Sequence, residues 1–332
     1  MKQRLKQHNL ETESFLQMNH FLKEFGPGDL ADHRYARFFF ACCSLLAYRS
    51  HPVSEKYYHQ AGFDQVHLIS KDGAQCYVLI NSEILVVAFR GTEIKERSDV
   101  WADIKIWKTK RSKGGGGLVQ KKGLVHSGFK DELDKIWPDV LSYMRENTDK
   151  KLYITGHSLG GAMATIAASR ALYAQADHNA RYAAPLEEIY TYGAPRAGDK
   201  EFVQTLKFPH HRLQNNNDVV CRIPSVLLGY RHQCDSIYLN HSGYVKTFGS
   251  WQRFCDMIKG RWRAILKGQL FDGVYDHSMD KYCKKLYNIW KDEFYFLHTA
   301  DLDSPMLARR AEAEKEEKGA YKKVQYYKKT KK

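Results

Sequence analysis

The stretch from residue 151 to residue 174 constrains the fold more than any other part of the chain. It begins with a strand pattern, Lys151–Thr155, which runs straight into Gly-His-Ser-Leu-Gly-Gly at 156–161. An alanine-rich helical pattern follows and extends to about Ala174. A strand that turns into a helix over so few residues needs glycines around the turn, because neighbouring backbones pass close by there. This order of elements is typical of an α/β sheet.

Other strand patterns surround this turn on both sides. They are Cys76–Ile80, Ile84–Phe89, Ile189–Tyr192 and His211–Gln214. The second of them reads ILVVAF, a continuous apolar run that predicts a strand buried on both faces. A helical pattern at 31–48 precedes these strands, and another at 130–145 lies between the strand patterns Ile84–Phe89 and Lys151–Thr155. Strands that alternate with helices predict an α/β protein with a mostly parallel central sheet and helices on both faces.

Positive charge is concentrated in three segments. The chain of 332 residues has a net charge of +14, yet residues 1–10, 105–122 and 321–332 hold three, seven and six basic residues and no acid. The rest of the chain is close to neutral. A basic chain suggests nucleic acid or an anionic membrane as a partner. Because no nucleic-acid-binding fold accompanies the charge, we expect peripheral binding to an anionic membrane surface and no nucleic-acid partner.

Composition also divides the chain. Residues 1–30 are polar and end in Gly-Pro-Gly, which predicts an N-terminal extension. Residues 31–303 carry the strand and helix patterns and form the predicted domain. Residues 304–332 are charged and rich in lysine, which predicts a separate tail. Within the domain, 93–122 is basic and contains four consecutive glycines, a composition typical of a flexible segment.

The cysteines and the first residues bear on location. The seven cysteines contain no Cys-x-x-Cys pair, which favours free thiols in a reducing compartment over disulfides or a zinc site. The first 25 residues contain no continuous apolar stretch of the kind a cleavable signal peptide has. We therefore predict a cytoplasmic protein, with a route of secretion that needs no signal peptide left open.

Ser158 is the candidate nucleophile. It occupies the central position of Gly-x-Ser-x-Gly, in which a strained turn lifts the serine hydroxyl above the sheet beside the positive end of a helix dipole. A serine needs a general base and an acid to orient that base, and the chain order in this architecture is serine, acid, histidine.

Asp218 is the preferred acid, because it follows the strand pattern that ends at Gln214. Asp199 and Asp235 are its rivals, although Asp199 is better placed to cap the helix that follows it.

For the base, His277 is preferred over His232 and His241, which lie on or beside a strand-like stretch. Chain order alone does not decide among these three histidines.

Several motifs appear in one order between residues 35 and 300. They are Val86–Thr92 (VVAFRGT), Asp99–Asp103, Val125–Phe129, Gly156–Gly161, Tyr192–Gly198, Asn217–Val220 with Pro224, and Asp276-His277 with Tyr282. Along these motifs the chain resembles the class 3 lipase family, fungal-type lipases with an α/β-hydrolase fold.

The resemblance implies roles for particular residues. Ser158 would be the nucleophile, His277 the base and Asp218 its partner. Thr92 and the backbone N–H of Leu159 would form the oxyanion hole. The segment 93–122 would be a mobile lid, and its lysines would favour anionic lipid.

The resemblance also implies an activity. The chain would be a triacylglycerol lipase-like carboxylic-ester hydrolase that cleaves a lipid ester substrate, an acylglycerol, through an acyl-enzyme intermediate, with no cofactor and no metal. Two alternatives stay open because fold does not choose a substrate. One is a phospholipase A1 or lysophospholipase acting on anionic membranes, and the other is a non-catalytic lipid-binding protein of the same fold.

Overall fold

A central sheet of eight strands organises the computed structural model, which describes residues 17–23, 27–28, 30–91, 111–113, 123–175, 183–240, 245–246 and 276–299. In spatial order the strands are β1 (Gln65–Lys71), β2 (Ala74–Ile80), β3 (Ile84–Phe89), β6 (Lys151–His157), β7 (Leu186–Tyr192), β9 (His210–Asn215), β11 (Ile237–Leu239) and β12 (Val245–Lys246). The strands from β3 to β11 pair in parallel, whereas β1, β2 and β12 join antiparallel at the edges. The prediction of a mostly parallel sheet is confirmed.

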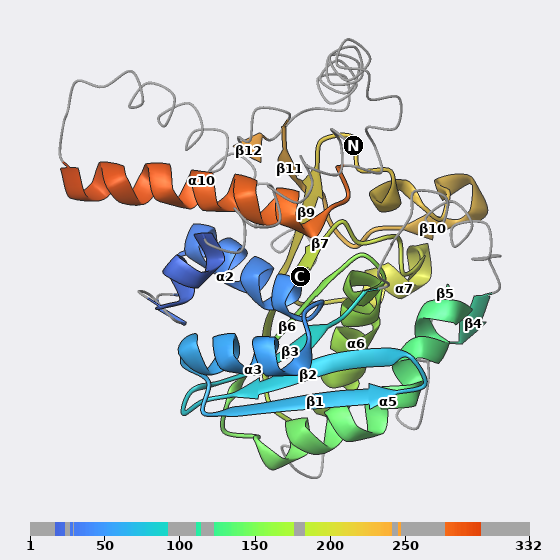
Figure 1. Cartoon of the computed structure of the whole chain (residues 1–332). Coiled ribbons are helices and arrows are strands. Elements are labelled where there is room, and N and C mark those ends of the chain that lie inside the picture. The colour runs from blue at the N-terminus through green and yellow to red at the C-terminus, as the bar shows by residue number, and fades with distance from the viewer. Residues whose placement is uncertain are drawn as a thin grey trace, which may run out of the picture.

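Helices cover both faces of this sheet (Figure 1). One face carries α2 (His33–Leu46), α3 (His51–Gln60) and the long α10 (Met279–Thr299), which lies alongside α2. The other face carries α5 (Ser127–Glu146), α6 (Leu159–Gln175) and the short α7 (Lys200–Thr205). Among the described helices, none has the length and apolar character needed to cross a membrane.

Strand β3 shows why the sheet separates two cores. All six of its residues are buried, as the ILVVAF run predicts. Val86 and Ala88 face the core under α2 and α10, whereas Val87 and Phe89 face the core under α5 and α6. Successive side chains of a strand point to opposite faces, so a continuous apolar run is needed where both faces are covered.

A second, smaller sheet lies outside the predicted pattern. Its strands, in spatial order, are β10 (Tyr230–Arg231), β8 (Gly198–Asp199), β5 (Leu124–His126) and β4 (Arg111–Lys113). Each has two or three residues, which is too short to produce a period-2 signal in the sequence. Two 3₁₀ turns accompany it, η1 (Val220–Arg222) and η2 (Val226–Leu228). The strand β4 is the part of the predicted lid region that the structure describes.

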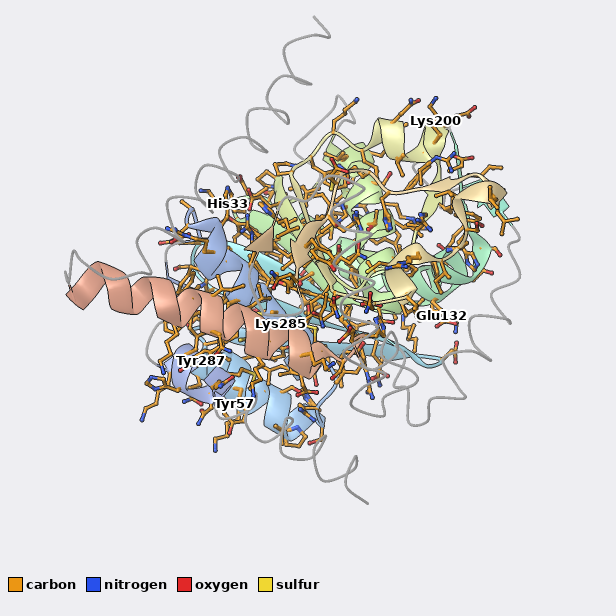
Figure 2. All side chains as sticks on the ribbon, turned by 90° about the horizontal axis from the view of Figure 1, so that it is seen from above. His33, Tyr57, Glu132, Lys200, Lys285 and Tyr287 are labelled. Carbon is orange, nitrogen blue, oxygen red and sulfur yellow. The ribbon has the colours of Figure 1, made fainter. Side chains whose placement is uncertain are left out.

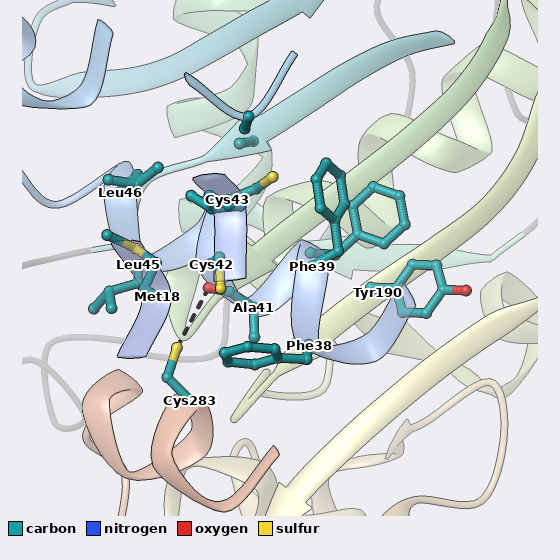
Figure 3. Close-up of a cluster of buried hydrophobic side chains, with 14 of the residues drawn as sticks. Met18, Phe38, Phe39, Ala41, Cys42, Cys43, Leu45, Leu46, Tyr190 and Cys283 are labelled. Atoms are coloured by element: carbon teal, nitrogen blue, oxygen red, sulfur yellow. Dashed lines mark hydrogen bonds between the residues drawn. The ribbon is translucent and has the colours of Figure 1, made fainter. Parts of the chain in front are cut away.

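Part of the predicted N-terminal extension belongs to the core. Residues 17–23 are helical, and Met18, Phe21 and Leu22 are almost fully buried. Figure 3 shows Met18 beside Leu45 of α2. The polar composition of residues 1–30 hides these three apolar side chains, which have helical spacing and meet α2. The division of the chain at residue 30 remains a prediction.

We expect Phe40 to be a major contributor to stability. Its ring is fully buried and stacks on Tyr190 at 4.5 Å and on Tyr153 at 5.1 Å between ring centroids. Phe40→Ala should lower the free energy of unfolding by about 3–5 kcal/mol through lost burial and a residual cavity. Urea titration followed by circular dichroism measures this. Gln204→Ala, at an exposed position of α7, should change it by less than about 0.5 kcal/mol; equal effects would contradict the assignment.

Candidate active site

The turn between β6 and α6 places Ser158 at the carboxyl end of the central strands. Ser158 has a φ of +58°, a left-handed conformation that costs a non-glycine residue energy. Its N–H donates to the carbonyl of Tyr192 at 3.0 Å, which ties the turn to β7. A Cβ added to Gly156 would clash with the carbonyl of Gly160, and one added to Gly160 would clash with the carbonyl of Phe89. Both glycines are therefore required by the close approach of backbones.

Ser158, His277 and Asp218 form one continuous contact. His277 Nε2 lies 2.7 Å from Ser158 Oγ, and His277 Nδ1 lies 2.9 Å from Asp218 Oδ2 and 3.1 Å from Oδ1. The three residues are 3%, 4% and 0% exposed for His277, Ser158 and Asp218. A carboxylate only accepts hydrogen bonds, so His277 donates through Nδ1 and leaves Nε2 to accept from the serine hydroxyl. The chain thus brings together the three residues that sequence reasoning selected.

Two further donors stabilise the buried Asp218 carboxylate. The Tyr282 hydroxyl donates to Oδ2 at 2.7 Å, and the backbone N–H of Val220 donates to Oδ1 at 2.9 Å. Burial raises the pKa of Tyr282 well above its ordinary value, and the negative charge of Asp218 acts in the same direction. Tyr282 therefore remains a hydroxyl donor. The backbone N–H of Asn215 in turn donates to the Tyr282 oxygen at 2.8 Å, which fixes the orientation of that side chain.

His157 supports the backbone of His277. Burial, followed by the nearby His277, lowers the pKa of His157 well below its ordinary value, so the ring is neutral. Its Nε2 lies 2.7 Å from the carbonyl of His277, which only accepts, so Nε2 carries the proton. Nδ1 then accepts from the Tyr48 hydroxyl at 2.8 Å. The two imidazole rings stack at 4.5 Å between centroids.

Among the described residues, the rivals Asp199, Asp235 and His232 take no part in the contact between Ser158, His277 and Asp218. The carboxylate of Asp199 accepts from the N–H of Phe202 at the start of α7, as the capping prediction requires, and from the N–H of Leu124. Asp235 is exposed. His232 lies 2.8 Å from the carbonyl of Cys221 through Nε2. His241 is outside the described residues.

Leu159 and Thr92 are the two residues assigned to the oxyanion hole. Leu159 is the first residue of α6, so its N–H belongs to the first turn, where the N–H groups have no acceptor within the helix. Thr92 lies outside the described residues. Gly91, directly before Thr92, packs tightly against the turn between β6 and α6, since a Cβ at Gly91 would lie 3.2 Å from Ser158 Cβ.

Gly193 is a functional position that sequence reasoning did not single out. It has a φ of +59°, and an added Cβ would lie 2.7 Å from Asp218 Oδ2 and 2.8 Å from His277 Nδ1. Any side chain would therefore enter the contact between acid and base. The sequence does carry a signal here, a glycine directly after the last residue of an apolar strand.

The carboxylate of Asp276 holds the segment that carries His277. It is 4% exposed and accepts from Asn216 Nδ2 at 2.8 Å and from Lys281 Nζ at 2.7 Å. Lys285 of α10, labelled in Figure 2, donates to Asn215 Oδ1 at 2.5 Å. Asn215 and Asn216, at the end of β9, are thus hydrogen-bonded to residues on both sides of His277, to Lys285 after it and to Asp276 before it.

His33, Glu188 and His211 are a group of described residues whose side chains come close enough to share a metal ion. Glu188 Oε2 lies 3.7 Å from His33 Nδ1 and 3.4 Å from His211 Nε2. Burial lowers the pKa of His211 to about 4, and the positive charge of Arg37 acts in the same direction. The positive charge of Arg37 would also repel a metal ion bound to this group. The group also lies towards the amino ends of β7 and β9, away from Ser158, so we assign it no part in the chemistry.

Part of the chain is similar in sequence to known proteins. Residues 86–228 match the family described as lipase (class 3). A secreted mono- and diacylglycerol lipase of Fusarium solani is 32% identical over 142 residues, which are 40% of each chain. A secreted mono- and diacylglycerol lipase of Malassezia globosa is 28% identical over 163 residues, 47% of this chain and 51% of that one. The matched part therefore spans about half or less of these relatives.

Over this part of the chain, the predicted resemblance to the class 3 lipase family is confirmed. A Rhizomucor miehei lipase propeptide complex superimposes with a TM-score of 0.50 at 18% identity, over 64% of this chain and 68% of that one. At this identity the likeness shows the fold, and the predicted α/β-hydrolase fold is confirmed. The family match includes Ser158 and Asp218 and ends before His277, which the structure brings to them.

The prediction of a cytoplasmic location is wrong by the same comparison, because both relatives are named as secreted. Free cysteines had suggested a reducing compartment. Six described cysteines are free thiols, and five of these are buried. Burial raises the pKa of thiols such as Cys43 and Cys76, so they stay protonated and shielded from oxidants. Free thiols that are shielded in this way do not indicate whether the protein resides in a reducing compartment.

Gly193→Ala should slow the reaction of Ser158 with a fluorophosphonate by about 10²-fold or more, because the added methyl separates Asp218 from His277. Gly73→Ala is the matched control. Gly73 has a φ of +86°, but a Cβ there meets nothing within 4 Å. Both variants carry the backbone penalty, and only the first enters the site. Equal labelling rates in the two variants would contradict this account.

The stability of the protein should fall as the pH drops below about 6.5. Burial lowers the folded-state pKa of His157 and His211, so the unfolded chain binds protons that the folded chain excludes. Each excluded proton removes about 1.4 kcal/mol per pH unit. Urea titrations between pH 6.5 and pH 5 measure this slope. His211→Gln should reduce the slope by up to one proton; an unchanged slope would contradict the role of His211.

Proposed function

We propose that the protein is a serine carboxylic-ester hydrolase, a lipase that cleaves acylglycerols through an acyl-enzyme intermediate. The observation that carries the proposal is the continuous contact from Ser158 Oγ through His277 to the buried Asp218. An accidental serine in a glycine-rich turn would have no reason to meet a histidine from a segment about 120 residues away. We also infer an extracellular location from the names of the secreted relatives.

Acylation starts from the hydrogen bonds already present. His277 Nε2 takes the hydroxyl proton of Ser158, and Oγ attacks the carbonyl carbon of the ester. The carbonyl oxygen then carries negative charge, for which the N–H of Leu159 and the side chain of Thr92 are the proposed donors. Removing one donor of such an oxyanion hole typically costs about 3–4 kcal/mol in the transition state. Asp218 stabilises the imidazolium that forms at His277.

The intermediate collapses when the bond to the leaving alcohol breaks. His277 Nε2 gives its proton to that alcohol, and the acyl group stays on Ser158 Oγ. A water molecule then loses a proton to the same Nε2 and attacks the acyl carbon. The second collapse releases the fatty acid and returns the proton to Ser158. Every proton in the cycle moves through one nitrogen, whose position Asp218 and Tyr282 hold.

The proposed substrate class follows from the relatives. Two of them are named as mono- and diacylglycerol lipases, and we transfer acylglycerols to this chain as a proposal. Phospholipids are the alternative, which the net charge of +14 favours on anionic membranes. Monoolein, diolein, triolein and diacyl phosphatidylglycerol, presented at equal surface concentration, separate the two. Faster release of fatty acid from phosphatidylglycerol than from all three acylglycerols would replace our proposal by the alternative.

Ser158→Ala should abolish labelling by a fluorophosphonate and lower the rate of hydrolysis of a short-chain soluble ester by at least about 10⁴-fold. Asp218→Asn should lower that rate by about 10⁴-fold, because the amide favours the wrong imidazole tautomer.

Asp199→Asn is the matched control for Asp218→Asn, since an asparagine still caps α7. It should hydrolyse the ester at a rate close to that of the unaltered protein. Labelling that persists in Ser158→Ala, or loss of turnover in Asp199→Asn alone, would overturn the assignment.

A further inference from the structure

The turn η2 presents three adjacent apolar side chains to solvent. Val226, Leu227 and Leu228 are 45%, 93% and 46% exposed, and they are the large hydrophobic residues with high exposure in the described part of the chain. Single exposed hydrophobic residues are ordinary on protein surfaces, whereas a contiguous group marks a site of interaction. We call these three residues the apolar tip.

The backbone of the apolar tip is fixed in the exposed arrangement. Ser225 Oγ accepts from the N–H of Leu227 at 3.2 Å, and the carbonyl of Ser225 accepts from the N–H of Leu228 at 3.1 Å. Gly229 closes the turn with a φ of +84° and donates to the carbonyl of Val226 at 3.0 Å. The turn therefore holds Leu227 outward, and a partner that binds it need not order the backbone first.

Two arginines bind the base of the tip. Arg231 Nη1 donates to the carbonyl of Val226 at 2.8 Å, and Arg196 Nη1 donates to the carbonyl of Pro224 at 2.8 Å. These bonds place positive charge directly beside the apolar side chains.

Further positive charge lies near Arg196. The pKa of Arg196 falls to about 10, first because the side chain is partly buried and then because other cations lie nearby. These cations are Arg212, Arg222 and Arg231. Lys200, exposed at the rim of the view in Figure 2, follows the residue that pairs with Tyr230 between β8 and β10. Glu201 is an exposed acid next to it. The balance beside the tip favours an anionic partner.

The chain connects the tip directly to the proposed catalytic acid. Asp218 begins the loop whose first turn is η1 and whose second turn is η2, and the N–H of Val220 in η1 donates to the Asp218 carboxylate. A surface that binds the tip would therefore contact the same loop that holds the catalytic acid.

We propose that the apolar tip inserts into the surface of an anionic lipid layer while Arg231, the exposed arginine at its base, binds the lipid phosphates. An apolar group next to a cation fits a lipid interface, where acyl chains lie directly beneath charged headgroups. The inference deepens the proposed function, since a lipase acts on substrate held in such a layer. A second copy of this chain fits less well, because arginines would then face arginines.

Vesicle binding tests the proposal without any need for turnover. The full chain carrying Ser158→Ala is sedimented with vesicles of phosphatidylcholine and phosphatidylglycerol at 70:30, or of phosphatidylcholine alone, at low salt. Leu227→Ser should weaken binding to the anionic vesicles about tenfold or more. Leu227→Phe keeps an apolar side chain there and should bind at least as well as the parent.

Charge is tested separately. Arg231→Gln should weaken binding to the anionic vesicles about fivefold, and Arg231→Lys should restore most of it. Lys56→Gln, at an exposed position of α3, is the matched control that removes the same charge elsewhere and should leave binding unchanged. Equal binding to neutral and anionic vesicles by the parent would overturn the role of the arginines.

The remaining outcomes separate this inference from the proposed function. Unchanged vesicle binding by Leu227→Ser would overturn the docking role of the tip. A smaller particle in size-exclusion chromatography of that variant would assign the tip to contact between copies, which also overturns it. With Ser158 intact, Leu227→Ser should hydrolyse a soluble short-chain ester at the rate of the unaltered protein. Absence of that hydrolysis in the unaltered protein would instead count against the proposed function and leave the vesicle result standing.

Discussion

A single buried carboxylate governs how the ends of the sheet are arranged. Asp218 has no exposed surface, and its charge can stay there only because His277, Tyr282 and the N–H of Val220 all donate to it. Removing the partners of a buried charge is far more costly than never burying it. The donors come from α10, from the segment before it and from η1, so stabilising one carboxylate requires three parts of the chain to meet. The site is thus assembled by the same contacts that close the fold.

The turn between β6 and α6 imposes the second constraint, because the backbones around it pass too close together to leave room for side chains. Ser158 holds a left-handed backbone conformation, and four glycines nearby, at 91, 156, 160 and 193, leave no room for a Cβ. Two of them let backbones pass one another, and Gly193 leaves room for the acid and the base. Strain at the serine is therefore maintained by packing on every side rather than by a favourable local conformation. A rigid frame of this kind can hold a histidine nitrogen 2.7 Å from the serine oxygen.

Features that depend on local pattern could be predicted from the sequence. The parallel sheet follows from apolar runs such as ILVVAF, and Ser158 follows from glycines placed between a strand and a helix. Asp218 and His277 needed chain order and family resemblance as well, because a lone acid or histidine carries no periodic signal. The second sheet was missed because strands of two or three residues have no period. Gly193 and Asp276 stand inside motifs of the sequence but received no role, because their importance lies in what each side chain, or its absence, meets across the fold.

The fold brings together positive charges that are far apart in the sequence. In the sequence it stands out at residues 1–10, 105–122 and 321–332, where basic residues occur without acids. The arginines that lie near one another in the fold produce no such run, since residues 196, 212, 222 and 231 are spread over the sequence and among ordinary neighbours. The fold brings two of them, Arg196 and Arg231, to backbone carbonyls at the base of η2. A net charge describes the whole chain, whereas recognition of a lipid surface depends on a few cations held next to exposed apolar side chains.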